Sequence, residues 1–96
     1  MSLKSLVESK QDTILRIAQI NGVKKISVFG SVAKEEDHEH SDIDFLVEFE
    51  DHRTLFDLIR LKHDLEALLN RSVDVVTENA VHWKLKDQIL HEAIQL

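Results

Sequence analysis

The sequence predicts a small α/β fold in which helices pack against a sheet of few strands. Its 96 residues suit one small domain. Apolar residues make up 43% of the chain and charged residues 31%, which is an ordinary globular balance. Stretches with helical spacing of apolar residues alternate with short strand-like stretches. Because no proline, repeat or linker divides the chain, we treat residues 1–96 as a single domain.

The N-terminal stretch predicts one helix. From Leu3 to about Asn21, apolar residues recur at roughly helical spacing. Gly22 follows at once, and glycine is the residue that most readily takes the left-handed conformation after a helix end. We therefore expect a helix that ends at Asn21 and is capped by Gly22.

The stretch "VKKISVFG" predicts the first strand. Its residues alternate, with Ile26 and Val28 on one face, and the strand is expected to end at Gly30. A short turn or helix is expected to follow over residues 31–36.

The stretch "SDIDFLVEFE" predicts the second strand, with an apolar and a polar face. The apolar face carries Ile43, Phe45, Val47 and Phe49. The opposite face carries Asp42, Asp44, Leu46 and Glu48.

The remaining chain predicts helix, strand and helix. Thr54 is expected to cap a helix that continues to Leu69, with Asp57 in the capping-box position. The stretch "NRS" interrupts it, and "VDVVT" over residues 73–77 predicts a third strand. Asn79 is expected to cap a last helix. The expected apolar contacts of that helix are Trp83, Ile89, Leu90, Ala93 and Ile94. With only three strands, the sheet is expected to have an edge that a partner or a helix covers.

Composition excludes several classes of protein. The net charge of -6 argues against broad, non-specific binding of nucleic acid. No apolar run is long enough to span a membrane, and the N-terminal stretch lacks the apolar core of a signal peptide. Because cysteine is absent, no disulfide framework exists, which suits a reducing cytoplasm.

The acids are concentrated between residues 35 and 51, where nine acids occur without a lysine or arginine. Such a run is usually a solvated surface. The other interpretation is a cation site, and the spacing of the acids decides between the two.

Three acids favour the cation site. Asp42 and Asp44 are two residues apart in a strand, so both carboxylates project from one face. Asp74 lies between valines in the third strand, where an unpartnered acid is costly if buried. If the second and third strands are neighbours, the three carboxylates repel one another unless a cation is bound. Carboxylate oxygens are the ligands that Mg²⁺ prefers.

Gly30 and Ser31 favour a phosphate site. A Gly-Ser pair at a strand-to-helix turn lets the backbone approach a ligand closely, and free N–H groups with the hydroxyl can bind phosphate oxygens. One edge of the sheet could then hold a triphosphate beside two metal ions, which activate a hydroxyl and stabilise a leaving pyrophosphate.

Each signal has a plainer alternative. A Gly-Ser pair after a strand is usually only a turn, an Asp-x-Asp pair often faces solvent, and a lone strand aspartate is often a satisfied structural acid. His38 and His40 flank Glu39, but without further ligands they indicate a solvated loop. The combination, in this order along the chain, is more specific than its parts.

Taken together, these residues resemble the minimal nucleotidyltransferase (MNT) family of the DNA polymerase beta-like nucleotidyltransferase superfamily. The family pattern is a strand ending in Gly-Ser, about ten residues, and then Asp-x-Asp in the next strand. Here Gly30-Ser31 is followed by ten residues and then by Asp42-Ile43-Asp44. The resemblance covers nearly the whole chain.

The resemblance implies a fold with a small mixed sheet, ATP as substrate, and two Mg²⁺ ions held chiefly by Asp42 and Asp44. Asp74 matches the third acid, which is a further metal ligand or the base for the attacking hydroxyl. Gly30 and Ser31 match the triphosphate-binding pair. Some family members act as antitoxins that transfer AMP to a tyrosine of a HEPN-domain RNase toxin, so the resemblance implies such a toxin as partner.

One departure concerns the residues after Gly-Ser. Many relatives carry "GSxARG", whereas this chain has "GSVAKEE", with Lys34 in place of the arginine and Glu35 in place of the glycine. Lys34 keeps the positive charge at this nucleotide-binding position but loses the bidentate fork of arginine. Glu35 adds a negative charge near the expected phosphates.

Three functions therefore stay open. The first is a Mg²⁺-dependent enzyme that transfers AMP to a protein hydroxyl. The second is a binding module of the same fold that neutralises a partner by contact. The third is a nucleotide or metal sensor. The acid triad favours the enzyme, and the altered loop favours the binding module. A homodimer through a sheet edge or helix is a further hypothesis.

Overall fold

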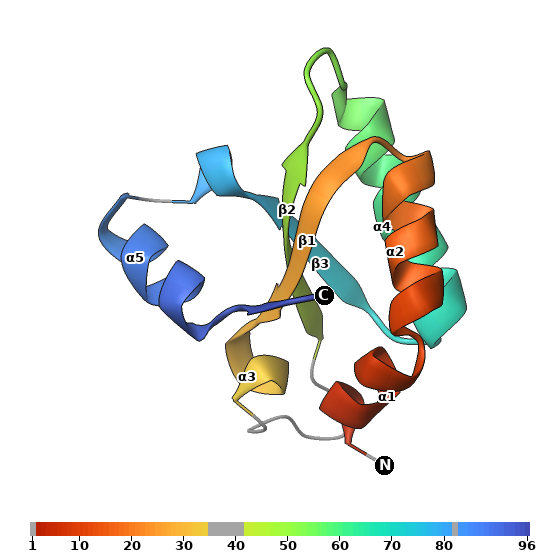
Figure 1. The fold of residues 1–96 in the computed structure, drawn as a ribbon, viewed down its shortest axis with the longest axis vertical. Helices are drawn as coiled ribbons and strands as arrows, with labels where there is room; N and C mark the ends of the chain where they lie inside the picture. The colour runs from red at the N-terminus through yellow and green to blue at the C-terminus, as the bar shows by residue number, and fades with distance from the viewer. Residues whose placement is uncertain (1, 35–41, 82) are drawn as a thin grey trace.

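The computed structural model describes residues 2–34, 42–81 and 83–96, and its elements alternate between helix and strand (Figure 1). The elements are α1 (Leu3–Ser9), α2 (Gln11–Ile20), β1 (Val23–Phe29), α3 (Gly30–Ala33), β2 (Ile43–Phe49), α4 (Leu55–Leu69), β3 (Val73–Thr77), the 3₁₀ turn η1 (Glu78–Ala80), α5 (Trp83–Glu92) and β4 (Ile94–Gln95).

The strands form one mixed sheet in the order β3-β2-β1-β4. β1 pairs antiparallel with β2 and with β4, whereas β2 and β3 run parallel. The parallel pair is possible because α4 forms the crossover between β2 and β3. The predicted α/β class with a small mixed sheet is confirmed.

The hydrophobic core lies between the sheet and three helices, α1, α2 and α4, which gather on one side of the strands (Figure 1). Ile43, Phe45 and Val47 from β2 are fully buried there, as the alternation of that strand predicts. Leu61 and Leu65 of α4 pack against the same cluster. α5 lies on the other side of the sheet.

The N-terminal helix is interrupted, where the sequence predicts one continuous helix. α1 ends at Ser9 and α2 begins at Gln11, with Lys10 between them at φ -112°. The Ser9 hydroxyl donates a hydrogen bond of 2.8 Å to the Leu6 carbonyl, so it competes with the backbone for that acceptor. Gly22 has φ +78° after the end of α2, which confirms the predicted left-handed cap.

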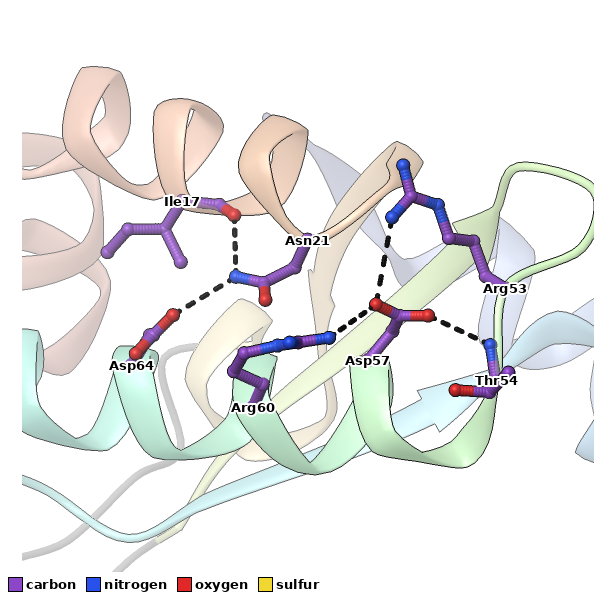
Figure 2. Close-up of polar contacts among 7 residues, drawn as sticks. All are labelled: Ile17, Asn21, Arg53, Thr54, Asp57, Arg60 and Asp64. Atoms are coloured by element: carbon purple, nitrogen blue, oxygen red, sulfur yellow. Dashed lines mark hydrogen bonds and ion pairs between the residues drawn. The ribbon is translucent and has the colours of Figure 1, made fainter.

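Helix α4 has both of its predicted ends. The Asp57 carboxylate accepts a hydrogen bond of 2.9 Å from the Thr54 backbone N–H, which confirms the capping box. Asn70 ends the helix in the left-handed conformation at φ 52°. Asp57 also forms ion pairs with Arg53, at 3.7 Å, and with Arg60, at 2.7 Å. Figure 2 shows both contacts.

A second polar contact joins α2 to α4. Asn21 is almost fully buried, and its Nδ2 donates to the Ile17 carbonyl at 2.9 Å and to Asp64 Oδ2 at 3.1 Å (Figure 2). Because a buried amide without partners is costly, these bonds fix the end of α2 against one side of α4.

The C-terminal stretch differs from the prediction in two ways. Asn79 does not cap the last helix, because it lies within the 3₁₀ turn that precedes α5. Ile94 is not helical but belongs to β4, whose residues pair with Ser27 and Val28 of β1. The open edge of β1 offers backbone hydrogen bonds that the last helical turn does not, so tertiary pairing decides the conformation. β4 thus covers part of the sheet edge that the sequence left open.

In the part of the chain that the structure describes, no helix has the length and apolar character needed to cross a membrane.

Candidate active site

The predicted site residues come from three strands whose ends meet at one end of the sheet. Because β2 runs antiparallel to β1 and parallel to β3, the end of β1 lies beside the beginnings of β2 and β3. In register, Asp44 is opposite Phe29 on one side and Asp74 on the other. The expectation that the second and third strands are neighbours is confirmed.

The aspartates project away from the core. Ile43 and Phe45 point into it, so the alternation of β2 places Asp44 on the opposite face. Asp74 is directly opposite Asp44 in the parallel pair, and side chains opposite each other share a face. Asp42 lies immediately before β2 and is exposed, as is Asp74, whereas Asp44 is half-buried.

Electrostatics couple the three carboxylates. Burial raises the pKa of Asp44 above its ordinary value, and the negative charges of Asp74 and then Asp42 raise it further. Each of these causes disfavours the ionised form of Asp44. A cation bound between the carboxylates would offset the negative charges of Asp74 and Asp42, so it would favour the ionised form of Asp44.

The donor set fits a hard divalent cation, because all three side chains offer only carboxylate oxygens. Within the described ranges, no three His, Cys, Asp or Glu side chains already converge as a metal site. The strands bring Asp42, Asp44 and Asp74 to one end of the sheet, where their charges already act on one another. The predicted loop residues 35–41, with His38 and His40, lie outside the described part of the chain.

Two constraints favour glycine at position 30, namely the backbone conformation of the turn and the close approach of Asp44. Its φ is +72°, in the region that favours glycine. A Cβ atom at this position would come within 2.5 Å of Asp44 Oδ2, so a larger residue would collide with the carboxylate. The sequence predicts Gly30 as a residue where the backbone approaches phosphate. Its contact with Asp44 depends on the pairing of β1 with β2, which the sequence alone does not give.

Ser31 lies in α3, the single turn of helix that follows β1, and Lys34 comes directly after that turn. Ser31 is half-buried in that turn, and Lys34 caps its C-terminal end. Lys34 Nζ forms an ion pair with Glu92 Oε2 of α5 at 3.2 Å. Sequence reasoning missed Glu92, because nothing in the spacing of the chain indicates that the end of α5 reaches α3.

Two surface hollows lie away from the aspartates. One of about 370 Å³ is at the opposite end of the strands, and another of about 410 Å³ lies beside α2 and β4. The first is lined by Lys24, Val47, Glu48, Phe49, Glu50, Asp51, Arg53, Thr77, Glu78 and Asn79. Neither hollow includes Asp42, Asp44 or Asp74, so we locate the candidate site by the register of the strands.

Comparison with known sequences gives a consistent match. The family model of the nucleotidyltransferase domain matches residues 11–96. A provisionally named protein adenylyltransferase of Methanocaldococcus jannaschii is 51% identical over 83 residues, which are 86% of this chain and 89% of the relative. Protein adenylyltransferase MntA of Thermococcus cleftensis is 40% identical over 73 residues, which are 76% and 74% of the two chains.

Solved structures of nucleotidyltransferase and toxin-antitoxin proteins are also similar to this chain. The structure of a provisionally named minimal nucleotidyltransferase has a TM-score of 0.89 and 43% identity, covering 100% of this chain and 97% of that one. A toxin-antitoxin crystal structure with AMP-PNP has a TM-score of 0.74 and 26% identity, covering 88% of this chain and 69% of that one.

Proposed function

The chain belongs to the nucleotidyltransferase domain family and is a nucleotidyltransferase, and from this premise we propose that it transfers AMP from ATP to a hydroxyl group of a partner protein. One observation carries the proposal. The register places Asp44 beside Asp74 and Gly30, so the acids and the Gly-Ser turn share one end of the sheet. The relatives named protein adenylyltransferase support the same reaction.

In the proposed reaction, the hydroxyl oxygen of the acceptor forms a bond to the α-phosphorus of ATP. The bond from that phosphorus to the bridging oxygen breaks, and pyrophosphate leaves with the electron pair. The hydroxyl proton must be removed as the new bond forms. Asp74, exposed beside Asp44, is either the base that takes this proton or a further metal ligand.

Asp42 and Asp44 would hold Mg²⁺, with Asp74 beside them. Two such ions supply activation of the hydroxyl and stabilisation of the charge on the leaving pyrophosphate. Gly30 and Ser31 would bind triphosphate oxygens through the backbone N–H groups and the hydroxyl of the first turn of α3. Lys34 would contribute a positive charge to the same phosphates.

For the partner, we propose a HEPN-type RNase toxin that offers a tyrosine hydroxyl, so that the chain acts as its antitoxin. The structure of a toxin-antitoxin pair with AMP-PNP, at 26% identity, supports a toxin as the partner. These 96 residues contain no tyrosine, so in this proposal the tyrosine hydroxyl belongs to the partner. We place the reaction in the cytoplasm, consistent with a chain that has no cysteine.

A second candidate is a binding module that neutralises the partner by contact alone. The ion pair between Lys34 and Glu92 favours the binding module, because in this pair the Lys34 ammonium binds a carboxylate instead of phosphate. The substitution of Glu35 for the glycine of many relatives points the same way.

The deciding experiment incubates the chain with labelled ATP, Mg²⁺ and the purified partner. We expect label on the partner, and its loss in the double variant Asp42→Asn with Asp44→Asn. The matched control is Asp51→Asn, because Asp51 is an exposed acid in the turn after β2, at the opposite end of that strand. A tight complex without transfer would reject the enzyme in favour of the binding module.

A further inference from the structure

Glu92 of α5 contacts a residue of the proposed nucleotide site. Its Oε2 lies 3.2 Å from Lys34 Nζ, and the side chains are 29% and 40% exposed. Its other oxygen, Oε1, accepts a hydrogen bond of 3.5 Å from Gln88 Nε2, one turn earlier in the same helix. The carboxylate of Glu92 is therefore oriented from within α5 toward α3.

The two edges of β1 pair with different strands. Asp44 lies on β2, which pairs with one edge of β1. Glu92 immediately precedes the segment that enters β4, which pairs with the other edge at Ser27 and Val28. The ion pair thus joins Lys34 to the end of α5 that leads into β4, whereas the aspartates lie on or beside β2 and β3.

We infer that Glu92 is a positioning residue that holds the Lys34 ammonium until the phosphates of ATP displace it. The inference rests on the proposed function, in which Lys34 contacts those phosphates. A carboxylate and a triphosphate compete for the same ammonium group, and the triphosphate carries the larger negative charge. Because the ion pair is partly exposed, its loss should change nucleotide affinity by only about two- to fivefold.

The pair also links nucleotide binding to α5. When Lys34 turns from Glu92 to phosphate, α3 and the end of α5 lose the ion pair that joins them. Nucleotide binding should therefore loosen the docking of α5, and loosening of α5 should make Lys34 more available to nucleotide.

The test measures ATP affinity by calorimetry with Mg²⁺ for the purified chain and four variants: Glu92→Gln, Lys34→Ala, the combination of both, and the control Asp87→Asn. Asp87 is an exposed acid on the same helix. We expect Glu92→Gln to bind ATP about two- to fivefold more tightly. Lys34→Ala should bind more weakly, the combined variant should equal Lys34→Ala, and the control should equal the unaltered chain.

Two further readouts separate positioning from a structural role. In the transfer assay, Glu92→Gln should lower KM for ATP and leave kcat unchanged. In a double-mutant cycle of thermal unfolding, Lys34 and Glu92 should be coupled without nucleotide and uncoupled at saturating ATP and Mg²⁺. Weaker or unchanged ATP binding by Glu92→Gln overturns the inference, whereas an unaltered chain that binds no ATP overturns the proposed function instead.

Discussion

Asp44 is half-buried between β1 and β3, with Asp74 and Asp42 as neighbours of like charge. Its position suits cation binding but opposes ionisation in the folded chain. A raised pKa means that the folded state holds the Asp44 proton more tightly than the unfolded state does. The contribution of Asp44 to stability is therefore present below the ordinary pKa of 3.8 and is lost as pH rises through the folded pKa.

We expect Asp44→Asn to raise the unfolding temperature at pH 7, because it removes a carboxylate that folding disfavours. The difference should shrink to nothing as the pH falls below about 3.8, where the unaltered carboxyl is neutral in both states. Thermal unfolding followed by circular dichroism in the presence of a chelator measures it.

The matched control for this prediction is again Asp51→Asn, which should show no such pH-dependent gain. Adding Mg²⁺ should stabilise the unaltered chain and not Asp44→Asn, since a ligand stabilises only the state that binds it. An Asp44→Asn chain that is less stable at pH 7 without metal would contradict the electrostatic interpretation.

At the scale of the element, α4 has an acid with the opposite behaviour. The Thr54 backbone N–H, the Arg60 side chain and the charges of Arg53 and Arg60 lower the pKa of Asp57, although its burial acts against them. Because the folded state favours the ionised form, this stability is present above the ordinary pKa of 3.8 and is lost as pH falls through the folded pKa.

We expect Asp57→Asn to lower the unfolding temperature at pH 7 and to do so progressively less below about pH 3.8. The amide keeps an oxygen that can accept from Thr54 but loses both arginine pairs. Scans of unfolding temperature against pH measure the change. A loss of equal size at pH 7 and pH 3 would show that packing, and not charge, is the cause.

The helices and strands also show which parts of the fold can be predicted from local sequence. The strand β2 follows from alternation, and both ends of α4 follow from Thr54, Asp57 and Asn70, because these signals act within a few residues. The break at Lys10 and the strand at Ile94 did not follow. The first coincides with a serine hydroxyl that shares a backbone carbonyl, and the second depends on an edge of β1 that exists only after the sheet has formed.

At the scale of the whole molecule, the candidate site also combines features that local sequence predicts with features that depend on the folded sheet. Asp42 and Asp44 could be assigned to one face from sequence, because they share a strand. Their proximity to Asp74 depends on the parallel pairing of β2 and β3, which alternation alone does not determine. The contact between Lys34 and Glu92 joins distant segments and could be found only in the folded chain.

Self-association remains a prediction at this scale. α4 exposes Leu55, Phe56 and Ile59, with Phe56 77% accessible. Exposed apolar side chains that adjoin one another are typical of contact surfaces. If the chain forms a homodimer through this helix, Phe56→Ser should shift it to the monomer in sedimentation experiments at micromolar concentration.

The control for self-association is Leu85→Ser, because Leu85 is an apolar residue of a different helix, α5, and is 52% exposed. It should leave the association unchanged. A monomer mass for the unaltered chain would remove the homodimer hypothesis.

The central place of β2 has a further consequence, for hydrogen exchange. β2 is paired with β1 on one side and β3 on the other, so its amide hydrogens exchange only when much of the sheet opens. The helix α5 sits outside the core cluster, and its amides should exchange through local opening. Deuterium uptake should therefore be slow around Asp44 and fast around Glu92, so that the two ends of the proposed site report separate unfolding events.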